Sequence, residues 1–429
     1  MVILVSTALS AAWLLTATNV HSATRLMFTA LALAGWGAVL AVWSRDGGLP
    51  TKLCWGAGLV LLTVAVARTP IGSRDIWSYV MQGRIVTVHH ASPYRVRPAR
   101  FPDDAFLHLT SLGWSHARSP YGPLFTAIEA GGSWLAGASV VANRLVHQVL
   151  AAVSVAGLAL LHERRRGDGG SVAFLLMSPV ALAVVNGGHN DLLVGALIAG
   201  AVLLMEERRH VLAGVVLAAG VLIKIVALLP AAVAVLWVWR RHGGRAAAGV
   251  GATLGAVTVA AYGLAGGMST LRIVLNSGAR TSRASLWQLV GATGVGDDLH
   301  QVSKLWALGG AVLVVVLTGL ALWRWWGAGT PRPLVVASVL AFLVSWPFVM
   351  PWYVGWGLPA AGGDPRELPS TWIAIFGSGL LLAYVVRPGQ PPTGVNAIVS
   401  AVAVPASLVV MVVVAVARRR SAWRPSPAV

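Results

Sequence analysis

Charge is scarce in this chain of 429 residues, of which only 11% are charged, whereas soluble globular domains carry about 25%. Apolar residues make up 57% of the chain, and its mean hydropathy is +0.75. This composition excludes an ordinary cytosolic fold. Apolar runs recur from end to end and are long enough to cross a hydrocarbon core about 30 Å thick. The sequence therefore predicts an all-α polytopic membrane protein.

Cysteine is nearly absent as well, and because Cys54 is the only one, no intramolecular disulfide can form. The 32 basic residues outnumber the 14 acidic ones and give a net charge of +18. Most of them lie between apolar runs, where basic residues orient a membrane protein, so we expect a lipid bilayer and no nucleic acid as partner. No P-loop, HExxH or GxGxxG motif is present in the sequence. We accordingly expect no metal and no other cofactor.

The positive-inside rule places the short basic loops in the cytoplasm, among them 162–170, 206–210 and 240–245. The clearest predicted spans are 2–18, 25–43, 52–67, 140–161, 171–186, 191–205, 246–264, 305–323, 333–349, 369–386 and 395–417. Two loops on the same side of the membrane must be separated by an even number of crossings, so further membrane segments are needed between some of these loops. We expect 211–239 to form two short helices that break near Lys224, and 352–361 to make a short extra pass.

The predicted architecture is a single integral membrane domain, 1–429, with about 14 membrane segments and both termini in the cytoplasm. Two long extracytoplasmic loops remain, 68–139 and 265–304. Long loops that are not needed to connect helices are common places for function. Of their acids, Asp103 and Asp104 lie in the middle of a loop, where solvation is the simpler account.

Asp75 lies a few residues after the third predicted span, at the outer interface, and three aromatic residues, Trp77, Tyr79 and Tyr94, follow it. A carboxylate shielded by aromatic side chains is suited to accept a proton from a hydroxyl group. The alternative is an interfacial salt bridge between Arg74 and Asp75 beside an aromatic belt.

His189, Asn190 and Asp191 lie between two spans with almost no loop, at the outer edge of the membrane. Asp191 alone is explained if it is the N-cap of the next helix. His189 and Asn190 are not, and polar clusters at membrane depth usually line a pathway or a pocket. We therefore expect a substrate-binding site here.

Lys224 is isolated in an apolar run at the predicted outer tip of 211–239. It either reaches the lipid headgroups, as long basic side chains do, or supplies a fixed positive charge for a phosphate leaving group. Arg280 and Arg283 in the second loop are further candidates, because arginine binds phosphate in a bidentate manner.

Two proline-rich corners complete the set of candidates. The stretch 119–124 contains Tyr121 between two prolines and fixes a rigid turn, which mostly shapes the loop. The stretch 347–356 contains Trp352 and Tyr353. It forms either an interfacial aromatic belt or a wall on which a sugar stacks.

Taken in order, these motifs resemble those of the actinobacterial polyprenol-phosphate-mannose-dependent mannosyltransferases, which are membrane enzymes of the GT-C fold, and in particular the α-1,6-mannosyltransferases of the MptA/MptB type. The motifs that carry the resemblance are 74–79, 82–84, 92–94, 119–123, 188–191, Lys224 and 351–353. They cover nearly the whole chain in the same order.

The resemblance implies a GT-C-type bundle in the plasma membrane, with its active site on the extracytoplasmic side. It implies a polyprenyl-phosphate-mannose donor and a membrane-bound glycolipid or mannan acceptor, such as lipomannan or lipoarabinomannan. Asp75 matches the family's essential aspartate and would be the general base of an inverting displacement. The chain is shorter than expected for the α-1,6 enzymes, which leaves an α-1,2 linkage or a pentose donor open.

Two other functions remain open at this point: a transporter or flippase for a lipid-linked saccharide, and a polymerase that moves a preassembled glycan. Transporters often consist of repeated halves with interrupted helices at matching positions. The predicted breaks near Lys224 and Pro351 do not recur at a matching period, and the loop 68–139 has no counterpart in the second half. This favours the transferase.

Overall fold

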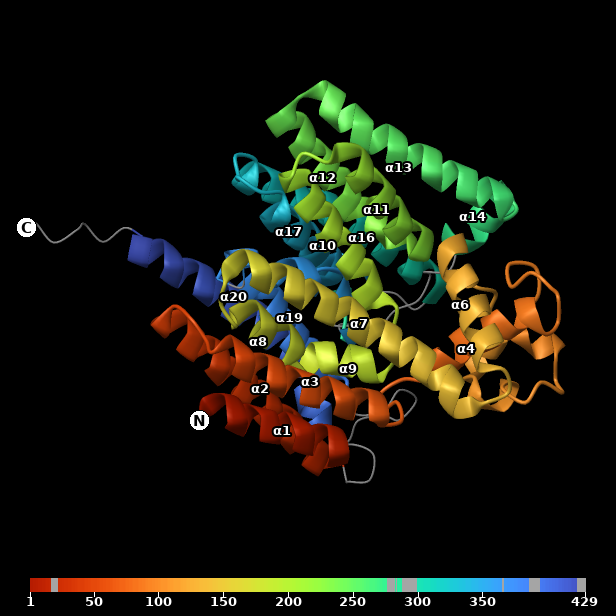
Figure 1. Ribbon diagram of the computed structural model, residues 1–429, viewed down its shortest axis with the longest axis horizontal. Coiled ribbons are helices and arrows are strands. Elements are labelled where there is room, and N and C mark those ends of the chain that lie inside the picture. The colour runs from red at the N-terminus through yellow and green to blue at the C-terminus, as the bar shows by residue number, and fades with distance from the viewer. Residues whose placement is uncertain are drawn as a thin grey trace, which may run out of the picture.

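The computed structural model describes residues 1–16, 22–275, 282, 284–287, 299–364, 366–385 and 394–422. Every regular element in these ranges is helical, which confirms the all-α prediction. Arg280 and Arg283 lie outside the described residues. Figure 1 shows α4 and α6 together at one end of the helical bundle, and the end of α20 at the other.

Among the described residues, six helices are long and apolar enough to cross a membrane. They include α2 (Ser22–Asp46), α7 (Val140–Arg166), α13 (Gly244–Leu264), parts of α16 (Leu299–Trp325) and α20 (Val395–Ala422), and the stretch Ile225–His242. Shorter apolar helices are α1 (Val2–Thr16), α3 (Thr51–Ala67), α11 (His210–Ile223), α17 (Arg332–Ser345) and α19 (Leu368–Ala383). The count of 14 segments stays a prediction.

The stretch 211–239 is broken at Lys224, as the basic loops on either side of it require. Helix α11 ends at Ile223, and Lys224 is extended, with φ −148° and ψ 118°. The chain then reverses its direction through the short η3 (Ile225–Ala227) and returns along α12 (Leu228–His242). The His210 and His242 rings, at the far ends of the two helices, lie 5.0 Å apart. Lys224 is therefore the tip of a helical hairpin.

Two other predicted segments are interrupted inside the bundle. The prediction of one helix over 171–186 is wrong: α8 (Gly170–Leu176) and α9 (Pro179–Asn186) replace it. The cause is Pro179, which lacks the amide proton that a continuous helix needs, and Ser178 instead caps the new helix by accepting from the Ala181 amide. The predicted pass 352–361 consists of η5 (Pro351–Trp356) and α18 (Leu358–Ala361), which pack on α10 (Asp191–Glu206).

The segment 68–139 folds into short elements that lie against the bundle. Helix α4 (Asp75–Thr87) packs on α6 (Pro123–Ala136), and the connection between them contains η1 (Pro98–Arg100), η2 (Leu107–Leu109) and α5 (Leu112–Ser115). A small core of its own holds this segment together, with Val80, Met81, Ile85 and Phe106 buried in it. Of the second predicted loop, 265–304, the structure describes mainly α14 (Met268–Leu275), and α16 begins earlier than expected, at Leu299.

Asp104 is not the solvated loop residue that the sequence suggests. It is 8% exposed and accepts hydrogen bonds from Arg84 Nε at 2.9 Å and from the Phe106 amide, while His89 Nε2 lies 2.7 Å away. Burial by itself raises the pKa of Asp104, but these partners hold the pKa below its ordinary value. The reason for the correction is that the segment has a core, so its middle is not a surface loop.

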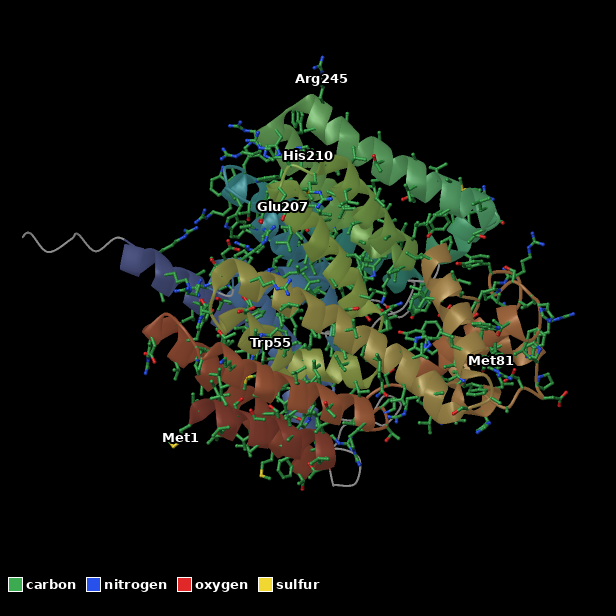
Figure 2. The ribbon with its side chains drawn as sticks, viewed as in Figure 1. Met1, Trp55, Met81, Glu207, His210 and Arg245 are labelled. Atoms are coloured by element: carbon green, nitrogen blue, oxygen red, sulfur yellow. The ribbon has the colours of Figure 1, made fainter. Side chains whose placement is uncertain are left out.

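The ends of the bundle differ in chemistry. Opposite to the Lys224 tip lie ion pairs between residues at helix ends, among them Arg165 with Glu206 at 2.8 Å and Arg332 with Glu367 at 3.0 Å. Figure 2 shows Glu207, His210 and Arg245 far from Met81, which marks the α4 side. The predicted site residues therefore lie at the end that is opposite to the predicted cytoplasmic loops.

Candidate active site

A cavity of about 1500 Å³ opens at the α4 end of the bundle. Three stretches contribute to its wall: 69–77, 111–121 and 342–356. Five of the predicted site residues line it, namely Asp75, Tyr121, Lys224, Trp352 and Tyr353. Segments that are far apart in the sequence thus meet around one volume, which is larger than most small-molecule sites.

The side chain of Asn186 fixes the turn between α3 and Asp75. Its amide nitrogen donates to the carbonyl of Ala65 at 3.0 Å, and its oxygen accepts from the amide of Ile71 at 2.8 Å. Gln148 donates to the carbonyls of both Arg68 and Asn186. These bonds satisfy carbonyl groups at the C-terminus of α3 that a helix end leaves without partners. The turn that leads into Asp75 is therefore anchored to α7 and α9.

The carboxylate of Asp75 is 16% exposed and lies between Trp114 and His189. Trp114 Nε1 donates to Oδ1 at 2.7 Å, and His189 Nδ1 lies 3.8 Å from Oδ2. Burial raises the pKa of Asp75, whereas the hydrogen bond from Trp114 and the positive charge of Lys224 act in the opposite direction. Among the described residues these contacts, rather than the salt bridge to Arg74, fix the carboxylate.

His189 reaches Asp75 because the turn before it is unusually tight. Gly188 has φ +61°, and a Cβ there would lie 2.5 Å from Ile76 Cδ1, so only glycine fits. The His189 ring is 2% exposed and stacks on Trp352, with centroids 4.1 Å apart and planes 11° apart. Asn190 is 3% exposed, and neither atom of its amide has a hydrogen-bond partner in the structure.

Asp191 and Lys224 form a buried ion pair beside Asp75. Lys224 Nζ lies 2.7 Å from Asp191 Oδ1, which also accepts from Trp356 Nε1. The ammonium group is 4.7 Å from the ring centre of Tyr353, 5.1 Å from that of Trp356 and 5.7 Å from that of Tyr121. Aromatic faces attract cations. The lysine is held in an aromatic cage, and Asp191 is the first residue of α10 rather than its N-cap.

Tyr79 and Tyr94 lie behind the cavity wall and do not line it. Tyr79 packs edge to face on Tyr121 with centroids 5.4 Å apart, and Tyr94 donates its hydroxyl proton to the carbonyl of Tyr121 at 3.0 Å. Both are buried. They fix Tyr121, which is the tyrosine that reaches the cavity.

Sequence reasoning did not identify Trp114 or Asn186 as contributors, and it placed Trp356 in the aromatic stretch 347–356 without predicting its contact to Asp191. Trp114 is separated from Asp75 by 39 residues and Trp356 from Asp191 by 165, so no local motif joins them. Among the residues that the structure describes, no three His, Cys, Asp or Glu side chains gather where they could hold a metal ion. The acid Asp191 is paired with a lysine instead.

Residues 1–241 match the family of the α-(1→6)-mannopyranosyltransferase N-terminal domain. This chain belongs to that family. It is 27% identical over 363 residues to α-(1→6)-mannopyranosyltransferase A of Mycobacterium tuberculosis, which covers 76% of this chain and 69% of the relative. The A enzyme of Corynebacterium glutamicum is 24% identical over 375 residues, 78% of this chain and 74% of the relative. The B enzyme of the same organism is 31% identical over 140 residues, 30% and 23% respectively.

Membership of this family makes the protein a hexosyltransferase, and the six long apolar helices make it a membrane protein. The transporter interpretation is thereby set aside. The resemblance drawn from the motifs is confirmed by the match over residues 1–241, which contains Asp75, His189 and Lys224.

Proposed function

We propose that this protein transfers mannose from polyprenyl-phosphate-mannose to a lipid-anchored mannan or another membrane glycolipid, on the outer face of the plasma membrane. The α-1,6 linkage is the one that the names of the relatives give. The observation that carries the proposal is the carboxylate of Asp75, fixed by Trp114 at the wall of a 1500 Å³ cavity that Lys224 also lines.

In the proposed reaction, an acceptor hydroxyl attacks the anomeric carbon of the donor, and its proton passes to the carboxylate of Asp75. The bond from the anomeric carbon to the phosphate oxygen breaks, and the polyprenyl phosphate leaves with the electron pair. A β-linked donor thus gives an α-linked product by inversion. A buried carboxylate whose pKa is raised is a stronger base than one in water, which suits this task.

Lys224 is our candidate for the group that stabilises the leaving phosphate. Its ammonium group lines the cavity and is held in place by Asp191 and three aromatic rings. A charge that is already oriented needs no reorganisation when negative charge develops on the phosphate. Asp191 supports this side of the site through its ion pair with Lys224, and Trp352 and Tyr353 present aromatic surface to the sugar.

His189 has a different role in this proposal from the substrate contact that we expect from the sequence. Its Nδ1 faces Asp75 Oδ2 and has no hydrogen-bond partner, and its ring is fixed against Trp352. We assign it to positioning the carboxylate of Asp75, since it lies beside the base.

The decisive test is Asp75→Asn. Asparagine keeps the shape and an oxygen that accepts from Trp114, but it cannot take a proton. We expect donor binding and thermal stability to remain close to wild type, while mannosyl transfer falls by about 10²–10⁴-fold. The assay uses purified protein, radiolabelled polyprenyl-phosphate-mannose and a lipid-anchored mannan acceptor.

Asp103→Asn is the matched control, because Asp103 is an exposed acid of the same segment, and it should leave transfer unchanged. Transfer within a few-fold of wild type in folded Asp75→Asn protein would contradict the assignment of the base. A polyprenyl-phosphate-pentose donor in parallel reactions tests the sugar, and glycosidic linkage analysis of the product tests the α-1,6 bond.

A further inference from the structure

A second cavity, of about 530 Å³, lies between α2, α8 and α19, away from the wall of the Asp75 cavity. Apolar side chains supply much of its lining, among them Leu33, Leu40, Phe174, Ala374, Ile375 and Leu382. Ala34, Gly37 and Ala41 of α2 line it and are exposed, so it opens toward the surroundings of the bundle. We call this cavity the lateral groove.

The lateral groove has the length of one lipid leaflet. Its lining runs from Leu33 to Ser44 on α2 and from Thr371 to Leu382 on α19. At 1.5 Å per residue, each stretch is about 16 Å long, which is half of a hydrocarbon core about 30 Å thick. The two helices run antiparallel here, since Arg25 near the start of α2 donates to the carbonyl of Val385, just after α19.

Among the groove-lining residues that the structure describes, the arginines lie at one end. The Arg366 guanidinium lies over the Trp43 ring, 4.6 Å from its centre. Arg418 of α20 donates to the carbonyl of Arg366 at 2.7 Å and to the hydroxyl of Thr371 at 2.8 Å. Both arginines line the groove and are exposed. Arginine and phosphate form strong charge-assisted hydrogen bonds.

Two acids near this end, Asp364 and Asp168, interact with another arginine, Arg166. Asp364 lies 3.5 Å from Arg166 and Asp168 lies 3.4 Å from it. The same end of the bundle carries the other basic loops, so an anionic headgroup would meet positive charge from several directions. An apolar slot one leaflet long with arginines at its mouth is complementary to a phospholipid.

We propose that the lateral groove binds one anionic phospholipid from the leaflet at the arginine-rich end of the bundle. Its phosphate lies between Arg366 and Arg418, and an acyl chain lies between α2 and α19. This site is separate from the proposed catalytic one and lies in the other leaflet. It holds a lipid of the membrane rather than a substrate.

Native mass spectrometry of the full-length protein tests the proposal, after incubation with phosphatidylglycerol or phosphatidylcholine of identical acyl chains. We expect wild-type protein to retain one phosphatidylglycerol in preference to phosphatidylcholine. Arg366→Gln with Arg418→Gln should lower that retention by about tenfold or more, because each arginine near a membrane surface contributes roughly fivefold to the affinity for anionic lipid. Arg45→Gln, an exposed arginine of α2 that does not line the groove, is the control.

Ala34→Trp tests the acyl-chain part separately. Ala34 is exposed, so the substitution leaves the core intact but fills the groove, and retention should fall although both arginines remain. Equal retention of the two lipids by wild-type protein would overturn the proposal. Unchanged retention in the double arginine variant would also overturn it. A wild-type dimer that dissociates on Ala34→Trp would overturn it too, because the groove would then be a protein interface.

Discussion

The hydrogen bond from Trp114 to Asp75 influences the pKa of the proposed base. A general base must be ionised, so transfer should rise as the pH rises through the pKa of Asp75. Trp114 favours the ionised form, because an N–H donor stabilises a carboxylate but not a carboxylic acid. Removing the donor therefore raises the pKa and moves the acidic limb of the pH profile to higher pH.

We predict this shift for Trp114→Phe, which keeps an aromatic ring but loses the donor. A hydrogen bond to a charged group is worth about 1.5–3 kcal/mol, so the acidic limb of kcat/KM should move up by about one to two pH units. Trp77→Phe is the control, since Trp77 lines the same cavity and does not donate to Asp75. An unmoved limb in Trp114→Phe would show that the indole is not a determinant of the base.

Some residues of the candidate site can be predicted from the sequence and others cannot. Asp75, Lys224 and His189 are polar residues in or next to apolar runs, so the cost of burying them marks them as exceptions. Trp114 is unremarkable in a membrane protein, because aromatic residues also form interfacial belts. Trp356 is predicted only as a member of the aromatic stretch 347–356. Only the fold shows that both indoles donate to carboxylates of the site.

At the scale of elements, the interrupted helices place the site. The break at Lys224 followed from the parity of the basic loops, which is a global constraint that the sequence contains. The break between α8 and α9 was not predicted, although Pro179 stands in the middle of the apolar run. Mean hydropathy is taken over a stretch of residues, so one proline hardly changes it. The missing amide proton of that proline nevertheless ends the helix. Its consequence is that α9 ends at Asn186, close to the end of α3.

We predict that Asn186→Ala destabilises the protein and slows transfer. The substitution leaves the Ile71 amide and carbonyls of Ala65, Arg68 and Thr69 without this partner. An unsatisfied buried polar group costs about 1–3 kcal/mol, so the midpoint of thermal unfolding in detergent should fall by several degrees. Transfer should fall as well, since the turn before Asp75 loses its anchor.

Ser154→Ala on α7 is the matched control, because its hydroxyl bonds only within its own helix, to the carbonyl of Leu150 at 2.7 Å. It should unfold close to the wild-type temperature. An unfolding temperature of Asn186→Ala close to that of wild type would show that the hydrogen bonds of Asn186 do not stabilise the turn before Asp75.

At the scale of the whole molecule, the short basic loops and the site lie at opposite ends of the bundle. Helix ends beside those loops carry ion pairs such as Arg165 with Glu206 and Arg332 with Glu367. The cavity with Asp75 and Lys224 lies at the other end. An excess of arginine in short loops is typical of the cytoplasmic side of a membrane protein. This asymmetry supports the proposal that the cavity faces outward, where a donor lipid in the outer leaflet would reach it.

The orientation gives the last prediction, which uses two exposed positions at opposite ends of the bundle in a Cys54→Ala background. Ala138, between α6 and α7, lies on the site side, and Gly244, at the start of α13, lies at the other end. A Cβ at Gly244 meets no atom within 4 Å, so a cysteine fits there. In intact cells, a membrane-impermeant maleimide should label Ala138→Cys at once and Gly244→Cys only after permeabilisation. Labelling of both from the same side would contradict the hairpin at Lys224 as a membrane element. The reverse pattern would place Asp75 in the cytoplasm, where the proposed outer-leaflet donor could not reach it.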